Sequence, residues 1–155
     1  MAAALITRLL RGKLIKSVGV EIMISGQRLT REQCSVGLKV ALRIIDAWRA
    51  TPAQACSILR ISLSTYRRAA RGLECGQRLD LDQQQRIGLV ISIHGFLRAA
   101  FSNQDNVKGF PGFKNDNSFF ECRTPLEIMA QGGLISLYET YRRIEQLHCG
   151  EIIAA

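Results

Sequence analysis

The side chains best suited to chemistry in this chain are hydroxyl and guanidinium groups gathered between Pro52 and Gly72, a stretch that reads PAQACSILRISLSTYRRAARG. Serine and threonine hydroxyls can meet bases or phosphates, and arginine can clamp a phosphate or form a forked contact with guanine. Such a set on one exposed helix face indicates contact with nucleic acid. The candidate DNA-binding residues are Ser62, Ser64, Thr65, Arg67, Arg68 and Arg71.

The spacing of apolar residues in this stretch predicts a helix-turn-helix that would position those side chains. Short helices are expected over about residues 52–60 and 64–71, with Ile61 filling the turn between them. Either Ser62 or Ser64 can cap the second helix. In this geometry the start of the second helix enters the major groove of DNA. A helical hairpin with a merely solvated basic face is the plainer alternative.

The formal net charge of +8 is distributed unevenly along the 155 residues. Residues 1–38 carry a net +4 and residues 39–78 a net +6, whereas residues 79–114 carry +1 and residues 115–155 carry −3. Basic charge concentrated on one small unit is the electrostatic footprint of nucleic-acid binding, because neutralising phosphates releases counterions. The basic front and the acidic back therefore predict two different partners.

Residues that could support catalysis or metal binding form no recognisable set. The five cysteines include no C-x-x-C pair, so buried, reduced thiols in a cytosolic protein are expected. His94 and His148 lie far apart in the sequence, without the spacing of metal ligands. A nucleophile–base pair and a glycine-rich phosphate loop are also missing. The sequence therefore predicts no enzyme activity, no metal and no cofactor.

The chain contains no apolar run of the roughly 18 residues needed to span a bilayer, so no membrane partner and a cytoplasmic location are expected. The first residues, MAAALITRLLRGKLIK, are basic and free of acids, and they faintly resemble a transit peptide. They lack a long apolar run and a clear cleavage site. Residues 1–28 are therefore predicted to be an ordinary amphipathic helix or a loose arm.

Longer helices are predicted on both sides of the helix-turn-helix. One runs from about residue 31 to residue 48, behind a capping box that Thr30 begins. Another covers about residues 81–101 and can begin at Asp80 or Asp82. Both have apolar residues at helical spacing, so each should bury one face.

The segment 103–117 is rich in Gly, Asn, Asp and Pro, and it is predicted to be a linker. A short strand is conceivable only over residues 20–24, which alternate weakly between apolar and polar types. The expected fold class is therefore all-α.

A dense helix-start signal stands at residues 124–127, Thr-Pro-Leu-Glu, where the threonine can cap and the glutamate can complete a capping box. Gly132 and Gly133 then end that helix and permit a sharp reversal. The following helix has apolar residues at helical spacing, namely Leu134, Leu137, Tyr141, Ile144 and Leu147. A two-helix unit without catalytic groups is better suited to gripping another protein than to running a reaction.

Residues 60–72, RISLSTYRRAARG, resemble the recognition pattern of the Xre-type, phage-repressor-like family. The resemblance implies an N-terminal helical domain that binds DNA through a helix-turn-helix. Arg60 stands where the family usually has glycine, so the turn must be made without a positive φ or under some strain. Leu63 stands where many repressors place a base-reading glutamine, so the resemblance does not carry base reading to that position.

The C-terminal unit, RTPLEIMAQGG followed by LISLYETYRRIEQL, resembles the toxin-binding domain of Xre/MbcA/ParS antitoxins. The matching positions are Asn117, Phe119, Arg123, Thr124, Pro125, Leu126, Ile128, Met129, Gly132, Gly133, Arg143, Ile144 and Glu145, while Cys122 stands where glycine is common. The resemblance implies an antitoxin that typically dimerises and covers the active-site entrance of a RES-domain toxin, which breaks down NAD⁺. It also implies repression of the operon through binding to operator DNA.

The candidate toxin-binding residues are Arg123, Tyr138, Arg143, Glu151, Ile152 and Ile153. Tyr138 would anchor an interface if exposed and would belong to the core otherwise. The family pattern favours a structural or interface role for Arg143. Glu151 or the terminal carboxylate could occupy a pocket built for a pyrophosphate, beside the two isoleucines. A frayed end without function is the default alternative for such a tail.

The predicted organisation is an arm over residues 1–28, a helix-turn-helix DNA-binding domain over 29–102, a linker over 103–117 and a toxin-binding domain over 118–155. The predicted function is that of a type II antitoxin and autorepressor, acting as a homodimer within a toxin–antitoxin complex. The alternative is a stand-alone dimeric transcriptional repressor whose C-terminal half only dimerises. A RES-like toxin encoded in the neighbouring reading frame would separate the two.

Overall fold

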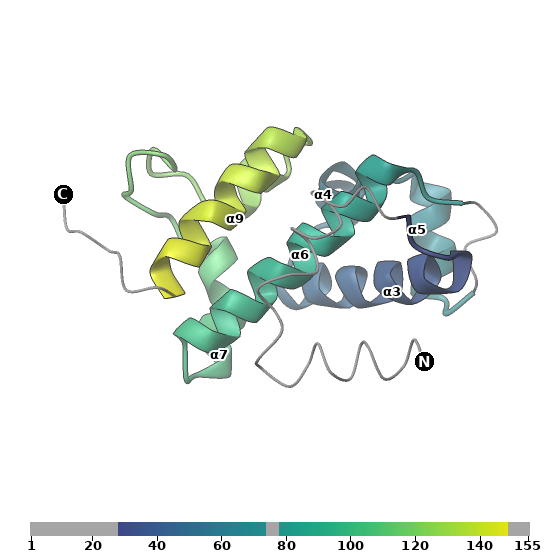
Figure 1. Cartoon of the computed structure of the whole chain (residues 1–155). Coiled ribbons are helices and arrows are strands. Elements are labelled where there is room, and N and C mark those ends of the chain that lie inside the picture. The colour runs from purple at the N-terminus through teal and green to yellow at the C-terminus, as the bar shows by residue number, and fades with distance from the viewer. Residues whose placement is uncertain (1–27, 74–77, 149–155) are drawn as a thin grey trace.

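The computed structural model describes residues 28–73 and 78–148, and every regular element within these two stretches is helical. Helix α6, Leu81–Ala100, runs through the centre, with α3, Arg31–Ala47, packed on one side and α9, Leu134–His148, on another (Figure 1). The expected all-α fold class is confirmed for this part of the chain. The predicted arm up to residue 27, which includes the weakly alternating residues 20–24, lies outside the described residues.

The close packing of α3 on α6 follows from the buried stripe of α3 and from one glycine where the helices meet. Thr30 caps α3 in a complete capping box with Gln33, as predicted. Leu38 is fully buried on the inner face. A Cβ atom at Gly37 would lie 3.2 Å from Ile87 Cγ2 of α6, so a side chain there would press the two helices apart.

Two short helices, α4 (Pro52–Leu59) and α5 (Leu63–Ala70), form the predicted helix-turn-helix. Thr51 caps α4 in a capping box with Gln54, and proline occupies a position at the start of the helix where its missing N–H costs nothing. Ile58 is fully buried and anchors α4 on the core that α3 and α6 share.

Helix α6 begins at Asp80, one of the two residues that the sequence offered as its cap, and Gln83 completes the capping box. Because both α3 and α9 pack on it, α6 buries far more than a single stripe. Its fully buried apolar side chains include Leu89, Val90, Ile93 and Leu97.

The segment 103–117, predicted to be a linker, is partly helical and packed on the rest of the molecule. It contains α7 (Gln104–Gly109) and a 3-10 turn, η1 (Phe110–Gly112). Val107 and Pro111 are buried and fix these turns in place. This stretch is therefore not an open tether, while the predicted division of the chain into domains stays a prediction.

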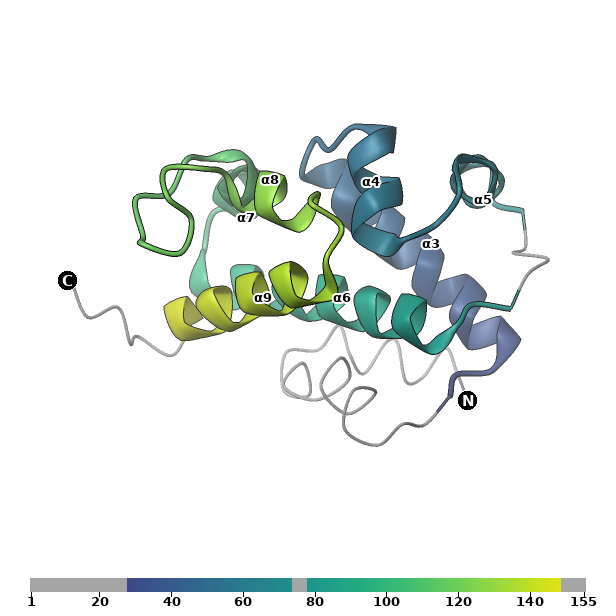
Figure 2. The ribbon, with the colours of Figure 1, turned by 90° about the horizontal axis from the view of Figure 1, so that it is seen from above.

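The C-terminal unit has the predicted form of a short helix, a reversal and a longer helix. Thr124 and Glu127 make the expected capping box at the start of α8, Pro125–Met129. The reversal passes through Gly132, whose φ of +83° lies in the left-handed region that favours glycine. Helix α9 then returns along α6, so α8 and α9 enclose part of the core between them (Figure 2).

The contact between α9 and α6 joins the C-terminal unit to the helix-turn-helix half through one continuous core. Leu137, Tyr141 and Ile144 are buried in that core together with residues of α3 and α4. The rings of Tyr141 and Phe96 lie 5.8 Å apart between centroids, inclined at 57°. The two halves of the chain therefore share their apolar interior.

Arg86 of α6 is the one buried charge that contacts both halves in the described part of the chain. Its side chain is 4% exposed, and its Nε donates to Asp82 Oδ2 at 2.8 Å. One terminal nitrogen, Nη1, donates to the carbonyl oxygen of Ile58 in α4 at 3.1 Å and to that of Gly132 in the α8–α9 reversal at 2.8 Å. A single guanidinium thus ties the helix-turn-helix to the C-terminal unit.

Replacing Arg86 with methionine should therefore weaken the whole fold. The substitution keeps an apolar stem but takes the guanidinium donor from two carbonyl groups and leaves Asp82 paired with Arg60 alone, so we expect Arg86→Met to lower the free energy of unfolding by about 3 kcal/mol. Chemical denaturation followed by circular dichroism measures this. The matched control is Arg98→Met, an exposed position on the same helix. Equal stability of the two variants would contradict the role given to Arg86.

Candidate nucleic-acid interface

Helix α5 lies at one edge of the molecule, where one of its faces is open to solvent (Figure 2). Ala69 is buried and Tyr66 packs against the core. The polar face carries the candidate DNA-binding residues: Ser62, Ser64, Arg67, Arg68 and Arg71 are exposed and Thr65 is half-buried. The fold therefore gathers all six on α5 and its two ends, while their contact with DNA stays a prediction.

Three hydroxyl groups cluster at the N-terminus of α5. Ser62 is the cap, and its Oγ accepts a hydrogen bond from the backbone N–H of Thr65 at 3.1 Å. The same Oγ lies 2.8 Å from Ser64 Oγ and 2.9 Å from Thr65 Oγ1. A helix N-terminus carries partial positive charge, so hydroxyl donors placed there suit an approaching phosphate.

The turn between α4 and α5 is made by Arg60 in a left-handed conformation, with φ of +52° and ψ of +45°. The sequence left open whether this residue would avoid a positive φ or adopt it under strain. In the structure Arg60 adopts the positive φ. A non-glycine residue in this region costs about 1–2 kcal/mol. The Arg60 side chain pairs with Asp80 and, at 2.7 Å, with Asp82, and its carbonyl accepts from Gln83 Nε2 at 2.8 Å. These contacts with the start of α6 hold the turn in place.

The same ion pairs also shape the charge around α5. Asp80 and Asp82 are the acidic residues at the start of α6, and both are matched by guanidinium groups of Arg60 or Arg86. Their negative charge is therefore offset locally, and it does not oppose the positive charge that Arg67 and its neighbours place on α5.

Basic residues outside the predicted set also border α5. Arg78 joins Ser62 and Thr65 around a hollow of about 430 Å³ at the start of the helix. Only the folded path of the chain brings Arg78 there, so no local pattern could have found it. Lys39 and Arg43 of α3 line a groove beside α5, and Lys39 Nζ donates to the carbonyl of Gly72 at 2.9 Å. Lys39 and Arg43 are four residues apart on a predicted helix, so the sequence could have indicated that they lie on the same face.

Two of the predicted toxin-binding residues, Arg123 and Arg143, lie beside aromatic or acidic groups of the C-terminal unit. The guanidinium carbon of Arg143 lies 5.3 Å from the centre of the Phe119 ring, a cation–π contact. Arg123 pairs with Glu121 at 3.0 Å, and its buried Nε has no hydrogen-bond partner among the described residues. Both arginines are partly open to solvent, so neither is sealed into the core.

Tyr138, the third candidate in the described region, is half-buried and packs against the core. Its ring stacks on Tyr141 with the centroids 5.9 Å apart. Burial, followed by the charge of Glu145, raises the pKa of Tyr141 to about 12, so its hydroxyl stays protonated and bonds Glu145 Oε1 at 3.2 Å. The remaining candidates, Glu151, Ile152 and Ile153, lie outside the described residues.

The loop before α8 holds Cys122 in a conformation that glycine adopts more readily, at the position where the resembled family commonly has glycine. Cys122 has φ of +58°, where glycine is normally favoured, and Glu121 before it has φ of +50°. The backbone N–H of Cys122 donates to the carbonyl of Asn115, and that of Asn115 donates to the carbonyl of Arg123, both at 3.2 Å. This pair of hydrogen bonds closes the loop and holds the two left-handed residues.

Within residues 28–73 and 78–148, no group of three or more His, Cys, Asp and Glu side chains could hold a metal ion. None of the helices in this part of the chain has the length and apolar character that crossing a membrane requires.

The pKa of the His94 side chain is lowered, mainly because the imidazole is buried and to a smaller extent by the positive charge of Arg98.

The family comparison assigns the region that contains this surface. Residues 27–92 match the family model of the antitoxin Xre-like helix-turn-helix domain. The match includes α3, α4, α5 and the first half of α6, and it supports a DNA-binding role of the Xre-like antitoxin type for this region. The C-terminal unit lies outside the matched residues. No significant match to a curated protein or to a solved structure was found.

Substitution of Ser62 tests whether its hydroxyl caps α5 or is only a hydroxyl group on the surface. Ser62→Ala removes the acceptor for the Thr65 N–H and should lower the free energy of unfolding by about 1 kcal/mol. Ser64→Ala is the matched control, because its hydroxyl bonds Ser62 rather than a backbone N–H. Thermal unfolding measures both variants, and a larger loss for Ser64→Ala would rule out the cap assignment.

Proposed function

We propose that this protein is the antitoxin of a type II toxin–antitoxin system, which binds operator DNA through α5 and neutralises a RES-domain toxin through its C-terminal unit. The observation that carries the proposal is the set of exposed arginines on α5, the second helix of the helix-turn-helix, inside the region that matches the Xre-like antitoxin domain. RES toxins degrade NAD⁺, and the antitoxin would cover the entrance to that active site. As a homodimer on the operator, it would also repress its own operon.

Two features of α5 favour DNA over another acidic partner. The N-terminus of α5 offers Ser64 and a partial positive charge at the end that meets the major groove in a helix-turn-helix. Arg67 and Arg68, within the same two turns, suit phosphate oxygens or the edge of guanine. The aspartates nearest to the turn are already paired with arginines, so they repel a phosphate backbone little.

The proposed toxin-binding surface rests on the resemblance of residues 123–145 to the toxin-binding domain of Xre/MbcA/ParS antitoxins. The net charge of −3 over residues 115–155, opposite in sign to that of the DNA-binding half, supports a separate partner. Ile135 at the start of α9 is 78% exposed, so its side chain is accessible to a protein partner at this end of the molecule. Arg123, Tyr138 and Arg143 are the proposed contacts there, together with the tail residues Glu151, Ile152 and Ile153.

A stand-alone dimeric repressor is the alternative, and the exposed Ile135 fits a dimer contact as well as a toxin contact. The two functions differ in what the C-terminal unit must do when DNA binding is lost. An antitoxin still neutralises its toxin, whereas a repressor retains no activity in a toxicity assay.

The DNA-binding proposal predicts a change in salt dependence. The double variant Arg67→Ala/Arg68→Ala should bind operator DNA at least about tenfold more weakly and reduce the slope of log affinity against log salt by about 1–2. Fluorescence anisotropy with a duplex from the region upstream of the gene measures both quantities. The double variant Arg98→Ala/Lys114→Ala, two exposed cations outside α5, is the control for net charge. An unaltered slope in the α5 variant would remove these arginines from the interface.

The toxin-binding proposal predicts separable activities. Co-expression with the product of the adjacent gene should give a complex that co-purifies, and the α5 double variant should protect cells as well as the natural sequence does. Deleting residues 150–155 should reduce protection, because the tail is proposed to reach the active site. Full protection by the truncated chain would sink the tail assignment, and absence of any protection by the intact chain would favour the stand-alone repressor.

A further inference from the structure

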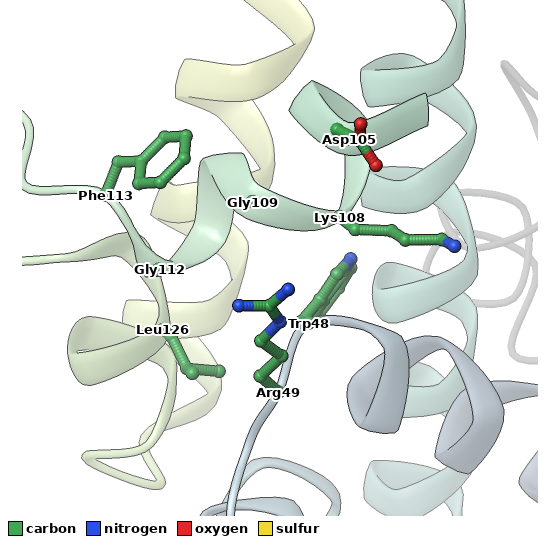
Figure 3. Close-up of a pocket in the computed structure, with 8 residues that line it drawn as sticks. All are labelled: Trp48, Arg49, Asp105, Lys108, Gly109, Gly112, Phe113 and Leu126. Atoms are coloured by element: carbon green, nitrogen blue, oxygen red, sulfur yellow. The ribbon is translucent and has the colours of Figure 1, made fainter. Parts of the chain in front are cut away.

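A cavity of about 450 Å³ lies between the end of α3, α7, η1 and α8 (Figure 3). Its walls are formed by Trp48, Arg49, Asp105, Lys108, Gly109, Gly112, Phe113 and Leu126. No residue proposed above to bind DNA or toxin belongs to this set. Cavities of 300–1,000 Å³ are typical of small-molecule sites, so the size suits a ligand of roughly nucleotide dimensions.

The side chain of Trp48 presents an unused hydrogen-bond donor at this cavity. The residue is 2% exposed, and its indole Nε1 has no hydrogen-bond partner among the described residues. In Figure 3 the indole stands between the side chains of Arg49 and Lys108. Buried N–H groups are nearly always hydrogen-bonded, so an acceptor atom of a bound ligand would supply the hydrogen bond that the indole N–H lacks.

Two cations flank the indole. Arg49 and Lys108 are exposed, and neither makes an ion pair within the described part of the chain. Arg49 has φ of +60°, a conformation that favours glycine, and its N–H donates to the carbonyl of Asp46 at 2.8 Å. This left-handed residue ends α3, and the N–H of Ala50 after it donates to the carbonyl of Ile45 at 3.3 Å, so the position of Arg49 is fixed by the backbone. The arrangement suits a phosphate, which two cations and a neutral N–H can hold together.

The opposite wall offers a flat apolar surface. The Phe113 ring is 60% exposed and lies across the backbone of Gly109, where a Cβ atom would be 2.7 Å from the ring Cζ. One face of the ring is therefore supported by the protein and another is free for stacking. Base–aromatic stacking is favourable for every nucleobase, because each has a π-face. The carboxylate of Asp105, on the first turn of α7, adds an acceptor for ring or amino N–H groups.

We propose that this cavity binds a small nucleotide, with the base against Phe113 and the phosphate beside Arg49 and Lys108. A simple inorganic anion would leave the aromatic wall and Asp105 unused, and an uncharged ring would leave both cations unused. Since the cavity is formed by α3 on one side and by α7 and α8 on the other, the bound nucleotide joins segments from both halves of the chain. The inference is independent of the toxin and DNA assignments.

The single tryptophan makes the test direct, because Trp48 is the only source of indole fluorescence in the chain. The intact protein is titrated with AMP, GMP, CMP and UMP, and the emission of Trp48 is followed together with the heat of binding. At least one of them should give a saturable change, while adenosine or guanosine and inorganic phosphate should each bind at least about tenfold more weakly. If none of the four nucleotides gives a saturable change in Trp48 emission or in heat, the proposal is overturned. Equal binding of inorganic phosphate would reduce the site to an adventitious anion site and overturn it too.

Matched variants locate the site. Arg49→Gly removes the guanidinium and places at φ of +60° the residue that this conformation favours, so the fold is expected to persist. This variant and Lys108→Gln should each bind the nucleotide about tenfold more weakly. Lys114→Gln, an exposed lysine outside the cavity wall, should bind it unchanged. Equal affinity of Arg49→Gly, Lys108→Gln and the unchanged protein would place the nucleotide elsewhere.

Discussion

The guanidinium of Arg86 is the contact on which the relation between the two halves of the molecule depends. A buried charge is tolerated only when its donors are matched, because desolvation is otherwise more unfavourable than the pair is favourable. Arg86 meets this condition with Asp82, the carbonyl of Ile58 and the carbonyl of Gly132. The last two belong to α4 and to the α8–α9 reversal. The helix-turn-helix and the C-terminal unit can therefore shift relative to each other only if a buried arginine loses its partners.

The network continues outward from Arg86 to the surface that is proposed to bind DNA. Asp82 accepts from Arg86 on one side and pairs with Arg60 on the other, and Arg60 makes the turn that aims α5. The exposed ion pairs of Arg60 contribute little stability individually. Their structural effect is larger, because they hold a non-glycine residue at positive φ and match the acidic charge nearest to α5. The departure from the family pattern at Arg60 is thus accommodated by the aspartates at the start of α6.

Local signals in the sequence were sufficient to predict the helices outside residues 103–117, whereas α7, η1 and the long-range contacts were not predicted from it. The capping boxes begun by Thr30 and Thr124 were predicted correctly because all their atoms lie within four residues. The same holds for the outward face of α5. Arg86 was not recognised, since its carbonyl partners lie 28 and 46 residues away along the chain. The stretch 103–117 was taken for an open linker because its polar composition outweighed Val107 and Pro111, whose burial depends on neighbours distant in sequence.

The net charge changes sign along the chain, whereas the apolar core is continuous, and this contrast affects how two partners could bind at once. The net positive charge lies in the first half of the sequence and the net negative charge in the last quarter. The first half therefore attracts an anionic partner, and the last quarter attracts a cationic one. The apolar core, in contrast, runs without interruption from α3 through α6 to α9. Within the described part of the chain, two macromolecules that bind opposite halves are therefore held relative to each other by this shared core. Whether the two proposed partners can be bound together is then decided by their own shapes rather than by motion between the two halves of this chain.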